Sequence, residues 1–269
     1  MPFTFSDRHI DEYHTQGYTV FERILPPSLI ADLRRVSDKA VELAREQNGG
    51  QIQRLQPVGK YDLDQQPFID YGDLPALIDA ISRILTPRHR HGDRDLFGIL
   101  LEPRDKPWCT NWHRDWRDNA MGLPLEKWDA VFSDPNYFNQ INCALYEDSC
   151  TWVVPGSHLR RDLKREADLF PDRPIVAPDL DGMTSEERES VCMDYTLSMP
   201  GAVQLHLCAG DFALYRNTLW HIGNYVPYRR RATIHDGAVT PEFKAFMSET
   251  RTLCEERKKM GFEMENPNS

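Results

Sequence analysis

Residues 96 to 236 consist of short β-favouring runs separated by turn residues. Each run has the length of one strand, and glycine, proline, asparagine or aspartate residues occur between the runs. About eight such strands in one region predict a sandwich or a barrel. The predicted strands cover residues 96–102, 110–116, 138–146, 151–154, 203–207, 212–215, 219–224 and 232–236, and a further short run lies at 17–21.

Helical patterns flank these strands. The longest has apolar residues at 4-3-4-3 spacing, which is typical of a helix with one buried stripe. The predicted helices begin near Ser6 and cover 26–47, 74–85 and 184–192, with a basic one after Ser157 and a last one after Thr240. The order is therefore helices first, strands second and a closing helix last.

The chain of 269 residues suits one large domain, because it has no Gly/Ser-rich linker, no low-complexity block and no internal repeat. Within a single domain over 1–269 we expect a mostly helical support in 1–93, the β core in 94–237 and a C-terminal helix in 238–269. Residues 51–72 are mixed in character, and an irregular stretch of that length predicts a lid loop.

Charge and cysteine usage narrow the class of protein. A net charge of −10 and a pI near 5.4 argue against a nucleic-acid partner, which needs clustered positive charge. Neither a membrane span nor a secretory signal is expected, because no long apolar run is present. Six scattered cysteines without a Cys-x-x-Cys pair suggest a reducing, cytoplasmic setting. The sequence indicates no oligomeric state.

The segment Trp112-His113-Arg114-Asp115 places an imidazole and a carboxylate two residues apart. On a strand, residues i and i+2 face the same side, so both groups could reach one point. Together they would form two thirds of the 2-His-1-carboxylate triad that holds Fe(II). The spacing alone is weak evidence, because His9 and Asp11 repeat it inside a predicted helix, where such residues diverge.

Four segments in this order resemble the phytanoyl-CoA dioxygenase family: Trp112-His113-Arg114-Asp115, Val154-Pro155-Gly156-Ser157-His158, Ala209-Gly210-Asp211 and His221-Ile222-Gly223-Asn224 with the following Arg230. The resemblance covers roughly residues 10–237. It implies a double-stranded β-helix (a jelly-roll, cupin-like core) that binds Fe(II) and 2-oxoglutarate. It also implies His113, Asp115 and His221 as the iron ligands and catalytic centre. We expect structural roles for His158, His206 and His235.

The resemblance further implies an arginine for the distal carboxylate of 2-oxoglutarate, since a guanidinium pairs with a carboxylate through two hydrogen bonds. The expected position is Ala232, but the spacing after His221 shifts it to Arg230, with Arg231 as the alternative on the other strand face. Relatives often carry a co-substrate-binding serine where Gly223 stands here. Asn142 and Lys60 are further candidates for co-substrate binding. Asn142 shares a strand face with Gln140, and polar residues inside a barrel indicate a cavity that holds a ligand.

The implied reaction is oxidation, by default hydroxylation, of a C–H bond in a small organic substrate, with dioxygen consumed and succinate and carbon dioxide released. Asp115 argues against halogenation, because halogenating relatives have a small residue at that position. Aromatic residues are expected to line the substrate pocket: Trp108, Trp112, Trp116 and Tyr146. Two alternatives stay open. One is a catalytically silent binding protein, and the other is a zinc-dependent hydrolase with the same ligands.

Overall fold

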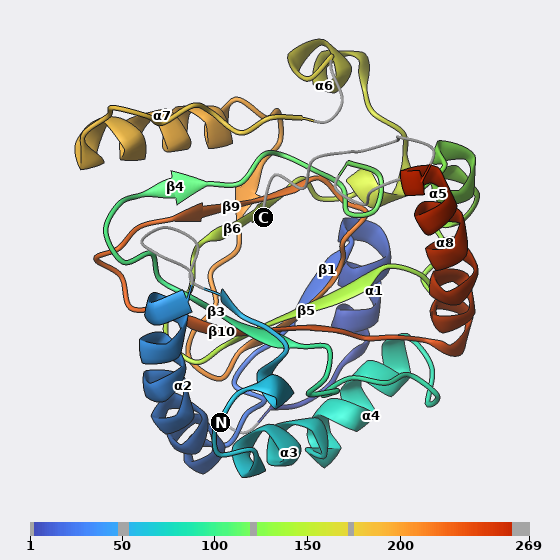
Figure 1. Cartoon of the computed structure of the whole chain (residues 1–269). Coiled ribbons are helices and arrows are strands. Elements are labelled where there is room, and N and C mark those ends of the chain that lie inside the picture. Colours follow the sequence, from blue (N-terminus) through green and yellow to red (C-terminus); the bar gives the residue numbers. More distant parts are fainter. Residues whose placement is uncertain (1–2, 48–53, 119–122, 172–174, 260–269) are drawn as a thin grey trace.

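The computed structural model describes residues 3–47, 54–118, 123–171 and 175–259 (Figure 1). Two antiparallel sheets form a barrel-like core, and helices cover its outer surface. This is the mainly β, jelly-roll architecture with flanking helices that the sequence predicts. In the described part of the chain, no helix is both long enough and apolar enough to cross a membrane.

The larger sheet has six strands, and the smaller has four. In spatial order the larger sheet contains β1 (Tyr18–Phe21), β8 (Phe212–Arg216), β5 (Asn139–Ala144), β10 (Ala232–Gly237), β3 (Gly98–Leu101) and β2 (Arg54–Leu55). The smaller sheet contains β4 (Trp108–Cys109), β9 (His221–Tyr225), β6 (Thr151–Val153) and β7 (Val203–Gln204). Paired strands run antiparallel throughout.

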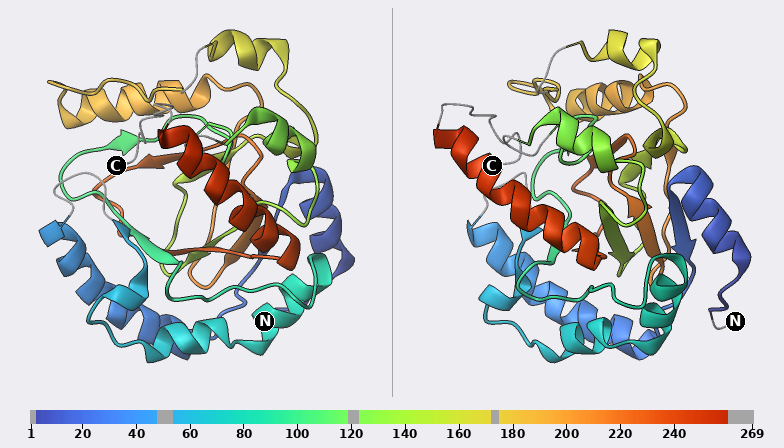
Figure 2. Two further views of the ribbon diagram at one scale, coloured as in Figure 1. Left: turned by 45° about the vertical axis from the view of Figure 1, so that its right-hand side comes forward. Right: turned by 90° about the vertical axis from the view of Figure 1, so that its right-hand side faces the viewer.

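Each group of helices covers a separate part of the core. The helices are α1 (Asp7–Gln16), α2 (Pro27–Gln47), α3 (Gln66–Gly72), α4 (Pro75–Ile84), α5 (Leu125–Val131), α6 (Lys164–Leu169), α7 (Ser185–Leu197) and α8 (Pro241–Lys259), with short 3-10 turns η1 (Val58–Lys60) and η2 (Ser157–Leu159). Helices α1 to α4 pack on the outer face of the larger sheet, and α7 packs on the smaller one. Helices α5 and α8 share an aromatic cluster at the side of the barrel (Figure 2).

Strand alternation separates the apolar exterior of the sheet from a polar interior. On β5, Ile141 and Cys143 pack into the core beneath the helices, whereas Gln140 and Asn142 line a cavity between the sheets. The same holds for β10, where Ile234 faces the helices and His235 faces the cavity. Side chains of the inner face are therefore available for binding and chemistry.

Two sequence expectations about local structure are wrong. Residues 54–72 are not irregular, because they form β2, η1 and α3 and contribute Leu55, Phe68 and Tyr71 to the main core. Residues 51–53 of that loop lie outside the described residues. The strand expected over 110–116 is not formed, since β4 ends at Cys109 and His113 makes only an isolated bridge with His221.

Candidate active site

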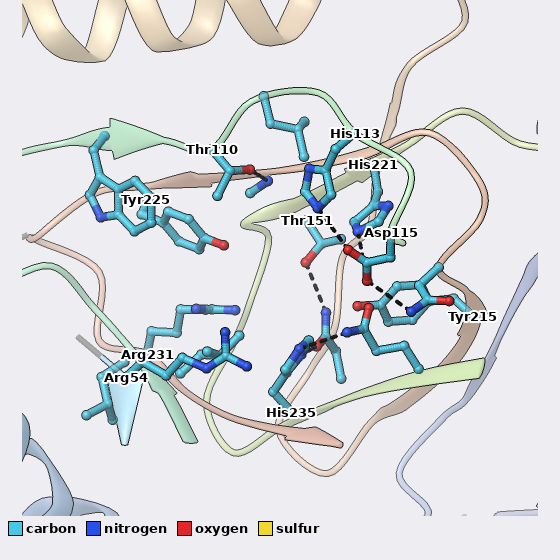
Figure 3. A pocket seen from close by; sticks show the side chains of 18 of the residues that line it. Arg54, Thr110, His113, Asp115, Thr151, Tyr215, His221, Tyr225, Arg231 and His235 are labelled. Atoms are coloured by element: carbon cyan, nitrogen blue, oxygen red, sulfur yellow. Dashed lines mark hydrogen bonds and ion pairs between the residues drawn. The ribbon is translucent and has the colours of Figure 1, made fainter. Parts of the chain in front are cut away.

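A cavity of about 440 Å³ lies between the two sheets (Figure 3). Strands of both sheets contribute to its walls, including β5 from the larger sheet and β9 from the smaller one. The polar residues that line it are Arg54, Thr110, His113, Asp115, Gln140, Asn142, Thr151, Tyr215, Asn217, His221, Tyr225, Arg231 and His235. A cavity of this size with converging polar groups is typical of a small-molecule site.

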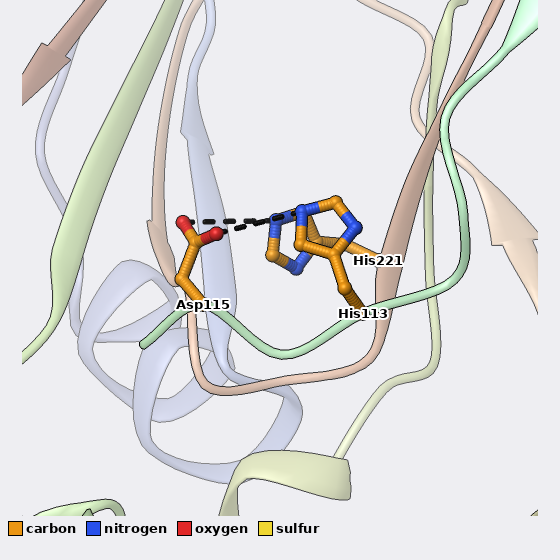
Figure 4. Close-up of side chains that lie close together, drawn as sticks. All are labelled: His113, Asp115 and His221. Carbon is orange, nitrogen blue, oxygen red and sulfur yellow. Dashed lines mark ion pairs between the residues drawn. The ribbon is translucent and has the colours of Figure 1, made fainter. Parts of the chain in front are cut away.

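His113, Asp115 and His221 meet on one side of this cavity (Figure 4). One nitrogen or oxygen atom of each residue lies within 4.8 Å of the corresponding atoms of the other two. His113 Nε2 is 3.4 Å from Asp115 Oδ1, and His221 Nε2 is 3.9 Å from Asp115 Oδ2. Within the described residues this is the only such group of three or more, and it consists of the three residues predicted as iron ligands.

Backbone hydrogen bonds fix the two histidines relative to each other. His113 N donates to His221 O at 3.1 Å, and His221 N donates to His113 O at 3.0 Å. Each ring Nδ1 also lies near a backbone carbonyl oxygen, that of Asn111 at 2.8 Å and that of Leu219 at 3.0 Å. If each Nδ1 carries the proton, its N–H group donates to these carbonyls. Each Nε2 then has a free lone pair with which to bind a cation.

Asp115 is held by two neighbouring elements. Its backbone N–H donates to Asn217 O at 2.8 Å, and Asn217 Nδ2 donates to Asp115 Oδ2 at 2.9 Å. The indole Nε1 of Trp128 donates to Asp115 O at 3.0 Å. The chain then turns at Trp116, which has a φ of 68°. A turn, and not a regular strand, therefore aims the carboxylate at the histidines.

The protonation of the two histidines differs. Burial lowers the pKa of His113, but the Asp115 carboxylate in contact with it outweighs that effect, so the pKa is raised. Burial and the neighbouring His113 lower the pKa of His221 to about 4, so its ring is neutral at pH 7. Two imidazoles and one carboxylate fit a divalent transition metal, and this set is typical of non-haem Fe(II).

Arg231, and not Arg230, faces the cavity. The side chain of Arg231 is 5% exposed, and its Nε donates to Asp148 Oδ2 at 2.9 Å. Burial alone would lower the pKa of Arg231, but Asp148 raises it, so the guanidinium is charged. Arg230 is 39% exposed and forms ion pairs with Asp38 and Glu102 outside the cavity. Our preference for Arg230 is corrected on this ground, because the two residues occupy opposite faces of the strand.

The other two predicted co-substrate residues differ in outcome. Asn142 is buried and lines the cavity, where its Nδ2 donates to Thr151 Oγ1 at 3.2 Å. Lys60 lies at the end of η1, is exposed and does not contribute to the cavity wall. The basic residue that β2 does place in the wall is Arg54.

His235 lines the cavity, whereas we expected a structural role for it. Its Nδ1 is 2.9 Å from Asn142 Oδ1, and its Nε2 is 2.9 Å from Gln140 Nε2. Burial lowers the pKa of His235 to about 3, with a further contribution from Arg54. A neutral ring with the proton on Nδ1 satisfies both contacts, which links β5 and β10 by a continuous polar chain.

The aromatic residues divide between wall and core. Trp108 and Trp116 line the cavity as expected. Trp112 is fully buried beneath α7, and Tyr146 packs outside against Arg34 and Arg230, so neither is a wall residue.

The other two histidines for which we expected structural roles lie away from the cavity. His158 is buried near His14, consistent with its structural role. His206 is exposed, whereas we expected it in the core or wall.

Sequence reasoning missed six polar wall residues: Arg54, Thr110, Thr151, Tyr215, Asn217 and Tyr225. Tyr225 could have been found, because alternation from His221 through Gly223 leads to it. Asn217 gives no such signal, since it precedes β9 and its contact with Asp115 joins positions 102 residues apart.

The sequence matches no profile of a protein family and no curated protein. The structure resembles several solved ones at low sequence identity. AviO1 from Streptomyces viridochromogenes Tue57 has a TM-score of 0.54 and 14% identity, covering 87% of this chain and 96% of that one. EvdO2 from Micromonospora carbonacea var. aurantiaca has a TM-score of 0.54 and 16% identity, covering 87% of this chain and 92% of that one.

A third similar structure is the epimerase SnoN in complex with Fe3+, alpha ketoglutarate and nogalamycin RO. Its TM-score is 0.55 at 17% identity, covering 87% of this chain and 83% of that one. EvdO2 has likewise been crystallised with 2-oxoglutarate. At these identities the likeness concerns the fold, and this chain shares the fold of non-haem 2-oxoglutarate-dependent enzymes.

Proposed function

We propose that this protein is a non-haem Fe(II)- and 2-oxoglutarate-dependent oxygenase that oxidises a C–H bond of a small organic molecule. The observation that carries the proposal is the convergence of His113, Asp115 and His221 in a cavity whose opposite wall carries buried, charged Arg231 (Figure 3). The solved structures with this fold support it, since SnoN and EvdO2 were crystallised with the same co-substrate. Membership of the phytanoyl-CoA dioxygenase family is part of the proposal.

His113, Asp115 and His221 would hold the metal through one side-chain atom each, and this donor set is typical of non-haem Fe(II) sites that also bind a co-substrate. With iron and 2-oxoglutarate bound, the site would use dioxygen to oxidise both the co-substrate, giving succinate and carbon dioxide, and a substrate C–H bond. The carbonyls of Asn111 and Leu219 keep the imidazole Nε2 atoms directed at the metal position, and Asn217 orients the carboxylate.

Arg231 would bind the distal carboxylate of 2-oxoglutarate. Asp148 takes only its Nε, and within the described residues no hydrogen bond engages the two terminal nitrogens of Arg231. These nitrogens are the pair that binds a carboxylate through two parallel hydrogen bonds. Asp148 therefore orients the guanidinium without occupying the face that a ligand needs.

The substrate we infer is small and polar. Amide, hydroxyl and imidazole groups of Gln140, Thr151 and His235 share the wall with Trp108 and Trp116. Such a wall provides hydrogen bonds for orientation and flat rings for stacking. Hydroxylation is the proposed outcome, although SnoN is described as an epimerase, so another oxidation can arise on this fold.

Calorimetric titration of 2-oxoglutarate tests the proposal, with Mn(II) as a redox-inert substitute for iron. We expect binding with the metal and a strong loss of binding in EDTA or in His113→Ala. Arg231→Ala should weaken binding by roughly 30-fold or more, because it removes a charged partner of the carboxylate. Arg230→Ala is the matched control from the opposite strand face and should bind as the wild type does.

Lack of 2-oxoglutarate binding by the metal-loaded wild type would refute the proposal. A loss in Arg230→Ala but not in Arg231→Ala would reverse the choice of arginine. A silent binding protein would bind both ligands without Fe(II)-dependent succinate release across a substrate panel. A zinc hydrolase would cleave an ester or amide with Zn²⁺ and show no dependence on 2-oxoglutarate.

A further inference from the structure

On β9, the side chain of Tyr225 lies over Gly223. Residues 221, 223 and 225 alternate to the same face of the strand, so both lie on the side of His221. A Cβ atom added to Gly223 would be 1.8 Å from the hydroxyl oxygen of Tyr225 and 2.3 Å from its Cζ. The phenol of Tyr225 therefore occupies the space that a side chain at position 223 would fill.

Two neighbours hold the Tyr225 ring in this position. The Trp108 ring lies with its centroid 4.6 Å from that of Tyr225, and the Arg231 guanidinium lies 4.9 Å from the ring centroid. The ring thus packs between Trp108 of β4 and the guanidinium of Arg231. The ring directs the hydroxyl into the cavity, on the side that faces the three metal-binding candidates (Figure 3).

The Tyr225 hydroxyl is a hydrogen-bond donor suited to an anion. Burial raises the pKa of Tyr225 to about 12, with Arg231 acting in the opposite direction, so the phenol keeps its proton at pH 7. Among the described residues, none hydrogen-bonds to this hydroxyl. A neutral O–H beside a guanidinium with two available nitrogens can add a charge-assisted hydrogen bond to the same carboxylate.

We propose that the Tyr225 hydroxyl, placed over Gly223, is a second donor to the carboxylate that Arg231 binds and is thus a co-substrate-binding residue. This inference rests on the proposed function. It accounts for the glycine at position 223, because any Cβ there would displace the phenol. Residue 225 supplies by its long side chain the polar group that position 223 lacks.

Tyr225→Phe tests the hydroxyl alone, because phenylalanine keeps the ring between Trp108 and Arg231. With Mn(II) bound, we expect its dissociation constant for 2-oxoglutarate to rise about tenfold or more, since a hydrogen bond to a charged group is lost. The affinity for Mn(II) itself should stay unchanged. Tyr228→Phe is the matched control, because Tyr228 is exposed and its hydroxyl contacts Glu189 away from the cavity.

A pair of variants tests the spatial match. Gly223→Ser should lower both thermal stability and 2-oxoglutarate affinity, because its side chain collides with Tyr225. Tyr225→Leu alone should weaken binding, and Gly223→Ser combined with Tyr225→Leu should recover part of it, since the serine hydroxyl then has room.

The two hypotheses fail differently. If the metal-loaded wild type binds no 2-oxoglutarate, the proposed function fails, and this inference fails with it. If the wild type binds and Arg231→Ala does not, but Tyr225→Phe binds as tightly as the wild type, only the role of Tyr225 is refuted. Weaker binding in Tyr228→Phe, equal to that in Tyr225→Phe, would refute it too.

Discussion

The ion pair of Arg231 and Asp148 joins the stability of the core to the chemistry of the cavity. Both side chains are at most 5% exposed. Asp148 also accepts a hydrogen bond from the hydroxyl of Thr233, and its pKa is lowered by Arg231 and by hydrogen bonds despite its burial. Such a pair is costly to break, because each charge has lost its hydration and depends on the other.

Asp148→Asn should therefore destabilise the protein by about 3 kcal/mol, since it leaves the Arg231 charge without a buried counter-ion. Asp38→Asn is the matched control. It removes the carboxylate paired with Arg230 at an exposed site, where the expected loss is about 1 kcal/mol or less. Urea unfolding of both variants measures the difference, and equal losses would contradict the account.

At this scale the sequence identifies the metal-binding candidates more readily than the residues that line the opposite cavity wall. His113, Asp115 and His221 stand in ordered motifs, so their side chains could be named from spacing and resemblance. Choosing between Arg230 and Arg231 requires knowing which strand face is inward, and a shift of one residue inverts that answer. The position of Tyr225 over Gly223 depends on side-chain direction, which the sequence does not reveal.

At the scale of elements, the end of α1 is locked against η2. Gly17 closes α1 with a φ of 88°, and a Cβ there would be 2.5 Å from Nδ1 of His158. The backbone N–H of Gly156 donates to Gln16 O at 2.8 Å across the same contact. Gly17 therefore meets two demands, a left-handed backbone and a close approach to another element.

Gly17→Ala should destabilise the protein more than Gly182→Ala does. Gly182 has a φ of 73° with nothing within 4 Å of its added Cβ, so its variant reports backbone strain alone, about 1 kcal/mol. The excess in Gly17→Ala measures the collision with His158. Thermal unfolding of the two variants gives the comparison, and equal shifts in Tm would show that this contact is unimportant.

Most of the predicted strands exist, but several short elements were not predicted from the sequence. Helix α5 and strand β2 were not predicted, and α3 was included in a loop. Seven residues or fewer provide too few repeats for a helical pattern to emerge, and β2 has only two residues. Their existence depends on tertiary partners: β2 pairs with β3, and α3 packs against α2.

At the scale of the whole molecule, the helices bury the outer faces of the sheets and leave polar groups on the inner ones. Six of the histidines, including His158 and His235, are strongly buried or held in the cavity wall. Buried neutral histidines tie folding to pH, because the unfolded chain binds protons that the folded chain excludes. The pH dependence of stability therefore reports on how the core is packed.

His158 gives the clearest case, since it lies away from the metal-binding candidates. Burial, with Arg216 and Arg114 nearby, lowers its pKa from 6.5 to about 4. Its contribution to stability is complete above pH 6.5 and is lost as the pH falls towards 4, with a slope of at most about 1.4 kcal/mol per pH unit. His158→Gln should flatten the urea-unfolding profile over this range, whereas the exposed-site variant His206→Gln should not.

The central claim, that one cavity joins a metal triad to a 2-oxoglutarate site, is tested most directly by the visible spectrum of the wild type. Without oxygen, Fe(II) and 2-oxoglutarate should together produce a metal-to-ligand charge-transfer band that neither produces alone. His113→Ala should abolish it, because the metal loses a ligand from the triad. A wild-type protein that shows no band with both ligands at saturating concentration would contradict the account.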